Sequence, residues 1–269
     1  MPLILFTSPK GGAGKTTLSA HVAATLAGRG RRVLAIDLDP QNALRLHLGL
    51  SIREESGFAA AIGQHPAWRS AALDTPSGVR LLPFGAADPR HVLELGAALL
   101  ASPELLAAPV RDMLTDPDLV VVVDSAPGPS SAASAIAPLA DLIVIVLLAD
   151  AASASLIPHV ASGRMHGPGT LAARMAERAT VVLNQVDLGS ALNATVMDSV
   201  AQLLGPRLLG AVCRDDAVAE ALADQRLLAD GAAAEDLGLL ADAIAARLKL
   251  NSLHARRPSY SALADCGLS

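Results

Sequence analysis

Aromatic residues are scarce in this 269-residue chain, which contains three Phe, one Trp and one Tyr. So few rings cannot build the stacking platforms on which proteins hold single-stranded nucleic acid. The formal charge is −5 and no basic run is longer than two residues. The cationic surface that drives strong, salt-dependent DNA binding is therefore missing as well, and we expect no nucleic acid among the partners.

Cysteine and long apolar runs are also lacking. Two cysteines in a chain of this length cannot make a disulfide framework and match no metal-ligand spacing, which favours a reducing compartment. Pro2–Thr7 is apolar but too short for a signal sequence. Asp141 and Asp150 interrupt the apolar stretch 132–158 before it reaches the roughly 18 apolar residues of a membrane-spanning helix. The sequence predicts a cytoplasmic protein without direct membrane insertion, with this stretch buried in the fold.

Short apolar runs rich in β-branched residues recur along the chain. They are continuous rather than alternating, which is typical of strands that are buried on both faces of a parallel sheet. The predicted strands are Leu3–Thr7, Arg32–Asp37, Val79–Leu82, Leu119–Asp124, Leu142–Leu147 and Thr180–Leu183.

Segments of helical periodicity lie between these runs. Leu18, Val22 and Leu26 form one apolar stripe, and Gly28 follows it as a stop signal. A second stripe near the C-terminus is formed by Leu240, Ile244 and Leu248. The alternation of strand and helix indicates an α/β fold, a doubly wound, mostly parallel sheet with helices on both faces.

We expect residues 1–250 to form a single domain. Two segments depart from the core pattern, namely Ser51–Pro89, which is rich in Gly, Pro and Ala, and the loop Ser162–Gly169. Residues 251–269 are polar with little periodicity, and we expect them to form a flexible C-terminal tail.

The most informative local pattern is SPKGGAGKTT, which lies between the first predicted strand and a predicted helix. Its glycines let the backbone curl so that N–H groups and the helix N-terminus surround a polyphosphate. In such a loop Lys15 would reach the β- and γ-phosphate oxygens, and the Thr16 hydroxyl would hold Mg²⁺. The residues predicted to bind the nucleotide here are Lys10, Gly11, Gly12, Ala13, Gly14, Lys15, Thr16 and Thr17. The alternative is a glycine-rich turn without a ligand.

Lysine usage supports a phosphate site. Of 21 basic residues only Lys10, Lys15 and Lys249 are lysines, and two of them lie in this loop. An ammonium is a compact point charge that fits a tight phosphate pocket better than a planar guanidinium does. The loop is nevertheless a variant, because Pro9 stands where the standard pattern has glycine and Lys10 is an additional lysine.

Three aspartates follow predicted strands. Asp37 and Asp39 end the second run and Asp124 ends the fourth, which places them at the carboxyl edge of a parallel sheet, where ligands of such folds bind. One carboxylate could hold Mg²⁺ and another could orient an attacking water. The alternative, that each aspartate only caps the following helix, stays open.

Together, Lys10–Thr17, residues 37–41 and residues 124–127 resemble the deviant Walker A ATPases of the ParA/MinD class, which are P-loop NTPases of the SIMIBI type. The resemblance implies a slow, Mg²⁺-dependent ATPase in which two subunits sandwich two ATP molecules. It further implies that Lys10 crosses the dimer interface to the partner's nucleotide and that Asp39 positions the attacking water. By the same resemblance, Mg²⁺ would be surrounded by Thr16, Asp37 and Asp124.

The resemblance also suggests contacts with adenine. Asn184 occupies the position where the class often has a base-binding asparagine, and the alternative is a loop residue whose hydrogen bonds are satisfied within the protein. Arg214 and Asp215 lie where relatives commonly have a proline-containing base clamp, although no proline stands here.

Within that class the chain is similar to the proteins that support bacterial cellulose synthesis and secretion. The similarity is carried by Asn42–Leu46, Gly57–Arg69, Leu81–Gly85 and Arg214–Glu220. It implies an ATP-dependent dimerising switch that other cellulose-synthesis proteins recruit peripherally to the inner-membrane synthase. The alternatives are a ParA-type ATPase that partitions DNA or cargo, a MinD-like spatial organiser, and a scaffold that never turns over its ATP.

Overall fold

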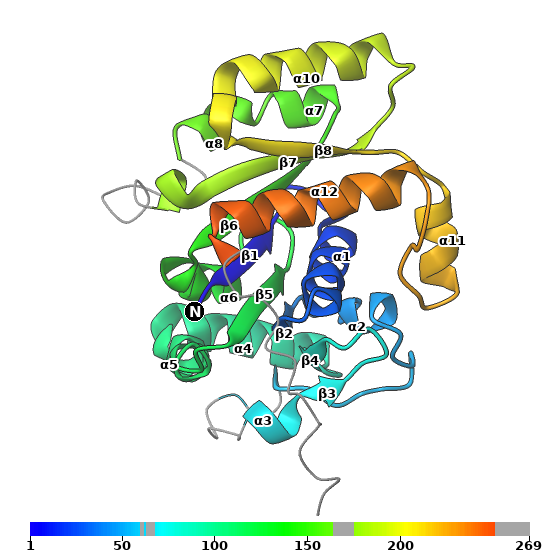
Figure 1. The fold of residues 1–269 in the computed structure, drawn as a ribbon. Helices are drawn as coiled ribbons and strands as arrows, with labels where there is room; N and C mark the ends of the chain where they lie inside the picture. Colours follow the sequence, from blue (N-terminus) through cyan, green and yellow to red (C-terminus); the bar gives the residue numbers. More distant parts are fainter. Residues whose placement is uncertain (60–61, 63–67, 164–174, 251–269) are drawn as a thin grey trace, which may run out of the picture.

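The computed structural model describes residues 1–59, 62, 68–163 and 175–250. In these residues eight strands form one sheet in the order β3-β4-β2-β5-β1-β6-β7-β8 (Figure 1). The strands are β1 (Leu3–Thr7), β2 (Arg32–Leu38), β3 (Leu73–Asp74), β4 (Arg80–Leu82), β5 (Leu119–Ser125), β6 (Leu142–Leu148), β7 (Ala179–Val186) and β8 (Leu208–Cys213). Every neighbouring pair is parallel except β3 and β4. The predicted tail 251–269 and most of the loop Ser162–Gly169 lie outside the described residues.

Helices cover both faces of the sheet, as the sequence predicts. They are α1 (Lys15–Gly28), α2 (Leu44–His47), α3 (Trp68–Ala71), α4 (Pro89–Ala101), α5 (Glu104–Met113), α6 (Ser131–Ile136), α7 (Ala151–Ala154), α8 (Ile157–Ala161), α10 (Ala191–Leu204), α11 (Ala217–Ala223) and α12 (Ala232–Arg247). Two 3₁₀ turns span Ala137–Leu139 and Gly205–Arg207.

Alternate side chains of the central strand point into two separate cores. Leu3 and Leu5 of β1 pack in the core that includes side chains of α4, α5, α8 and α10. Ile4 and Phe6 pack in the core formed with α1, α2 and α12. This is the arrangement of a strand buried on both faces, and Figure 1 shows α1 and α12 next to each other on one face of the sheet.

The predicted helical stripes are confirmed except at Leu248, which is the C-cap of α12 and only partly buried against the same core. Leu18, Val22 and Leu26 are buried on α1, which ends at Gly28, and Leu240 and Ile244 are buried on α12. The strand β6, in the middle of the apolar stretch 132–158, is buried except for its last residue. Among the described residues no single helix is long and apolar enough to cross a membrane, and only the pair α4 and α5, bent by 80°, meets the length and composition criterion together.

The sheet register brings the chemistry to one edge. β2, β5 and β1 are parallel neighbours, and Asp37 stands directly opposite Asp124. The loop between β1 and α1 leaves the same carboxyl edge. Residues from three distant parts of the sequence therefore meet above the middle of the sheet.

Candidate functional site

The phosphate-type loop connects β1 to α1 and has the backbone that its glycines allow. Gly12 and Gly14 adopt left-handed φ values of 73° and 84°, and Gly14 is the N-cap of α1. No side chain caps this helix, and no acidic residue lies in its first turn. The positive end of the helix therefore remains suited to an anion.

A cleft of about 500 Å³ lies over this loop. Most of the residues predicted from the sequence line it: Lys10, Gly11, Gly12, Ala13, Gly14, Lys15, Thr16, Thr17, Asp39, Asn184, Arg214 and Asp215. Asp37 and Asp124 do not line it and are fully buried beneath. The structure thus gathers the predicted site around one cleft with two aspartates under its floor.

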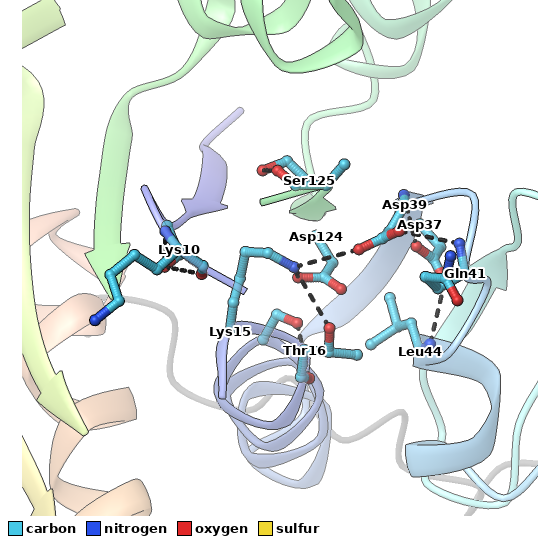
Figure 2. Close-up of polar contacts among 12 residues, drawn as sticks. Lys10, Lys15, Thr16, Asp37, Asp39, Gln41, Leu44, Asp124 and Ser125 are labelled. Carbon is cyan, nitrogen blue, oxygen red and sulfur yellow. Dashed lines mark hydrogen bonds and ion pairs between the residues drawn. The ribbon is translucent and has the colours of Figure 1, made fainter. Parts of the chain in front are cut away.

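Lys15 is held against carboxylates at the floor of the cleft (Figure 2). Its Nζ lies 3.0 Å from Asp124 Oδ1 and 3.9 Å from Asp39 Oδ2, and the side chain is only 6% exposed. It also donates to Thr16 Oγ1 at 3.4 Å. A phosphate that entered the cleft would compete with these carboxylates for the ammonium.

Asp124 keeps one oxygen free of protein donors. Its Oδ1 accepts from Lys15, whereas the buried Oδ2 has no hydrogen-bond partner among the described residues. Burial raises the pKa of this carboxyl, and the charge of Lys15 acts to lower it. A buried, unpartnered carboxylate oxygen is costly, so Asp124 fits a site where a bound cation or its water supplies the missing contact.

The chemistry of the donors fits Mg²⁺ rather than a metal held by protein alone. No group of three His, Cys, Asp or Glu side chains that could hold a metal occurs in the described part of the chain. Mg²⁺ typically takes one or two protein oxygens and completes its shell with waters and substrate phosphates. Thr16 and Asp124 provide such oxygens next to the loop.

Asp37 has a different environment. Its Oδ1 accepts from the Asp39 N–H at 3.0 Å and its Oδ2 from the Leu44 N–H at 3.1 Å. Because Leu44 is the first residue of α2, Asp37 holds the turn between β2 and that helix. Burial, followed by the charge of Asp124, raises the pKa of Asp37 well above its usual range. The capping role left open by the sequence is present here, and a role at Mg²⁺ stays a prediction.

Asp39 is the aspartate that faces the cleft. It is 9% exposed, and its Oδ1 accepts from the Gln41 N–H at 3.0 Å, which leaves Oδ2 directed toward Lys15. Figure 2 shows its carboxylate on the Lys15 side of the turn. The position suits the predicted orientation of a water molecule, which stays a prediction.

Lys10 points away from this cluster (Figure 2). Its Nζ lies 3.1 Å from Asp150 Oδ2, and the side chain is 34% exposed. Asp150 also caps α7, because its Oδ1 accepts from the Ser153 N–H. In this chain, therefore, the additional lysine does not serve the floor formed by Lys15, Asp39 and Asp124.

On the opposite wall, Asn184 is engaged with the loop. Its side chain is buried and Nδ2 donates to the carbonyl of Ala13 at 2.8 Å. Its Oδ1 and the second N–H of Nδ2 remain for a base contact. Arg214 and Asp215 line the cleft, but Nε of the exposed Arg214 lies 3.9 Å from Asp216 Oδ1, and Asp215 Oδ1 accepts from the Ala217 N–H at 3.0 Å.

Sequence reasoning missed three residues around the cleft. Gln185 donates through Nε2 to the carbonyl of Gly12 at 3.3 Å, and His47 lines the cleft from α2. Nδ1 of His21 lies 2.8 Å from the Thr17 carbonyl, and Nε2 accepts from the Leu228 N–H at 3.0 Å. Nothing in the local sequence separates these side chains from ordinary polar residues, because the contacts from Gln185 to Gly12 and from Leu228 to His21 join residues far apart in the chain.

Comparison with known proteins identifies similar sequences. The family described as "Cellulose biosynthesis protein BcsQ" matches residues 1–244 of this chain. Cellulose biosynthesis protein BcsQ of Escherichia coli (strain K12) is 40% identical over 76 residues, which are 28% of this chain and 30% of that protein. The matched segments span about a third of the length of the curated relatives.

Solved structures are similar over nearly the whole chain. The MinC:MinD cell division protein complex of Aquifex aeolicus has a TM-score of 0.72 at 20% identity and covers 96% of this chain and 99% of that one. The septum site-determining protein MinD of Pyrococcus horikoshii, complexed with Mg-ADP, has a TM-score of 0.70 at 20% identity and covers 90% and 95%. These similarities confirm the predicted P-loop NTPase fold.

Proposed function

The chain belongs to the BcsQ family of cellulose biosynthesis proteins, ATPases of the ParA/MinD class, and from this we propose that it is an ATP-dependent dimerising switch that supports bacterial cellulose synthesis. One observation carries the nucleotide part of the proposal. Lys15 lies at the base of an uncapped, glycine-shaped helix N-terminus, paired with carboxylates that include an unpartnered buried oxygen. This is an anion site with a cation site next to it.

In the proposed reaction the protein positions reactants and neutralises charge, which is the main demand of phosphoryl transfer. The loop N–H groups bind the phosphates of ATP. Lys15 leaves its ion pair with Asp124 and binds the β- and γ-phosphate oxygens instead. Asp39 accepts a hydrogen bond from the attacking water and orients it toward the γ-phosphorus. Hydrolysis to ADP and phosphate would be slow in the absence of a partner.

Mg²⁺ fits this arrangement. Thr16 Oγ1 and Asp124 would hold the ion, directly or through water. Asp37 would support the site indirectly, because the hydrogen bond that it accepts from the Asp39 N–H keeps the turn at Asp39 in place. The ion would supply positive charge against the phosphate oxygens. The Mg-ADP complex of the P. horikoshii MinD supports the pairing of nucleotide and Mg²⁺ in this fold.

Nucleotide binding can be tested at Lys15. Lys15→Gln keeps an N–H donor for Asp124 but removes the charge, and we expect the affinity for Mg-ATP to fall by about 10- to 100-fold, as for the loss of a charge-assisted hydrogen bond. Isothermal titration calorimetry measures this, with Lys249→Ala, the lysine outside the site, as the control. Equal affinity of Lys15→Gln and wild type would contradict the phosphate-loop assignment.

The cellulose role is supported by the family match and the BcsQ relative. We place the ATP-bound dimer at the inner-membrane cellulose synthase, recruited by other Bcs proteins. Cells from which the gene is deleted should then make little cellulose, and a copy carrying Lys15→Gln should not restore it whereas Lys249→Ala should. Normal cellulose in the deletion strain, together with salt-sensitive DNA binding by the ATP-bound protein, would favour a partitioning ATPase instead.

A further inference from the structure

Two consecutive side chains at the end of β7 bind the phosphate loop. Asn184 Nδ2 donates to the carbonyl of Ala13 at 2.8 Å, and Gln185 Nε2 donates to the carbonyl of Gly12 at 3.3 Å. Both residues line the cleft. The loop is therefore attached to a neighbouring strand through two adjacent carbonyl groups.

These contacts orient the loop's N–H groups. In a trans peptide the C=O and the N–H point in opposite directions, and the chain has no cis peptide in its described residues. The Gly12 carbonyl shares its peptide with the Ala13 N–H, and the Ala13 carbonyl shares its peptide with the Gly14 N–H. Drawing both carbonyls toward β7 turns both N–H groups the other way, as a cradle for phosphate oxygens requires.

An ordinary strand could not make both contacts. Successive side chains of a strand point to opposite faces, so Asn184 and Gln185 would be separated. Here Gln185 adopts a left-handed φ of 55°, and the pairing of β7 with β8 shifts register between Leu183 and Val186. This local departure from strand geometry lets both amides reach the loop.

The left-handed backbone of Gln185 accompanies the register shift between β7 and β8 and does not end a helix. Gln225 has a similar φ of 52°, but it follows Asp224, the C-cap of α11, at the position where a left-handed residue commonly ends a helix. Gln185 lies inside a strand, where this conformation is disfavoured for a residue with a side chain. Strain of this kind persists where the surrounding structure holds it, and it gathers at functional sites.

We propose that Gln185 is a positioning residue of the phosphate loop, which uses its left-handed backbone to hold the Gly12 carbonyl and so aim the Ala13 N–H at the ligand's phosphates. The proposal rests on the proposed function, because the ligand is the triphosphate of ATP. Asn184 acts in the same way on the next peptide, and its Oδ1 remains available for the base.

The test uses Gln185→Gly, since glycine adopts this φ without strain and lacks only the amide. We expect the dissociation constants for Mg-ATP and for inorganic tripolyphosphate to rise by a similar factor of about three to ten, which corresponds to the net free energy of one hydrogen bond. The melting temperature should not fall. Gln185→Glu, which keeps the size but sets a carboxylate against the Gly12 carbonyl, should weaken both ligands further.

Gln225→Gly is the matched control, because it removes the same residue type from the same backbone conformation outside the cleft lining. It should bind both ligands as wild type does. In the ligand-free protein, Gln185→Gly should also show faster hydrogen exchange at the Ala13 amide, and Gln225→Gly should not.

Two outcomes would overturn the proposal in distinguishable ways. If wild type binds tripolyphosphate and Gln185→Gly binds it equally well, the positioning role is wrong and the nucleotide site stands. If wild type binds neither tripolyphosphate nor Mg-ATP, the proposed function fails and the positioning role fails with it.

Discussion

Asp37 and Asp124 stand opposite each other in the register of β2 and β5, yet the partners of their carboxylate oxygens differ. Both oxygens of Asp37 accept backbone N–H groups, so this carboxylate shapes the turn that presents Asp39. Asp124 pairs with Lys15 and keeps one oxygen without a protein donor. At the scale of single residues, then, the number of free oxygens separates a scaffolding carboxylate from one suited to a cation.

The close approach of the phosphate loop to β7 can be tested by substituting Gly14. A Cβ built on Gly14 would come within 2.0 Å of Asn184 Nδ2, whereas one on Gly30, at nearly the same φ, meets nothing within 4 Å. Both Gly→Ala changes should lower stability by about 1 kcal/mol through the left-handed backbone. Only Gly14→Ala should also weaken Mg-ATP binding, as calorimetry would measure. Wild-type binding by Gly14→Ala would show that the loop tolerates displacement of Asn184.

His47 predicts a pH dependence of stability. Burial, and then the charge of His21, lowers the pKa of His47 from 6.5 to about 4. The unfolded chain therefore takes up the proton more readily, and stability that is fully present above pH 6.5 is lost as the pH falls toward 4, by at most about 3 kcal/mol. His47→Gln should flatten this slope in urea unfolding series, and the exposed His159→Gln should leave it. Burial lowers the pKa of His21 too, so part of the slope will remain.

At the scale of elements, α12 packs against two elements that lead to residues of the site. It packs against α1, the helix that carries Lys15 and Thr16, and against β8, which leads to Arg214. Its buried face includes Leu237, Leu240 and Ile244. A loss of packing at α12 would therefore disturb both α1 and β8, which lead to the two walls of the cleft.

The packing of α12 can be tested with two apolar truncations. Ile244 is fully buried and Leu239 is 66% exposed on the same helix. Ile244→Ala should lower the free energy of unfolding by about 2–5 kcal/mol, and Leu239→Ala should change it by about 0.5 kcal/mol or less. Denaturant titration measures both, and a loss of similar size in the two variants would contradict the orientation of the helix.

The strands that the sequence did not predict share a physical cause. β8 is mostly half-buried at the edge of the sheet, and β3 is a two-residue antiparallel strand at the other edge. Neither forms the continuous, fully buried run by which the central strands are recognised. The six predicted strands were found at or within a few residues of their expected bounds, because most of their residues are buried and form continuous apolar runs.

At the scale of the whole molecule, the cleft opens beside Lys10, which in this chain contacts Asp150 rather than the floor of its own site. To act outside the site formed by Lys15, this lysine would have to leave its ion pair with Asp150. The trans role implied by the resemblance to the ParA/MinD class stays a prediction, which makes dimerisation the property to measure.

The dimer should depend on Lys10 and on unhydrolysed ATP. By size-exclusion chromatography with light scattering, we expect wild type to be a monomer without nucleotide and a dimer with Mg-ATP. Asp39→Ala should remain dimeric for longer, because it lacks the group that orients water, and Lys10→Ala should bind ATP without dimerising. Lys249→Ala is the control, and an ATP-induced dimer of Lys10→Ala would contradict the trans role.

The sequence by itself determined the parallel α/β fold, the phosphate loop with Lys15 and Thr16, and the three aspartates at the sheet edge. These features are readable because they lie in contiguous residues, where backbone curl, continuous apolar runs and strand ends have local signatures. The tertiary structure alone decided that Asp37 braces a turn while Asp124 keeps a free oxygen, and that Gln185 reaches Gly12. Such contacts join residues far apart in the chain, so they depend on strand order, register and one left-handed backbone angle, which no local pattern encodes.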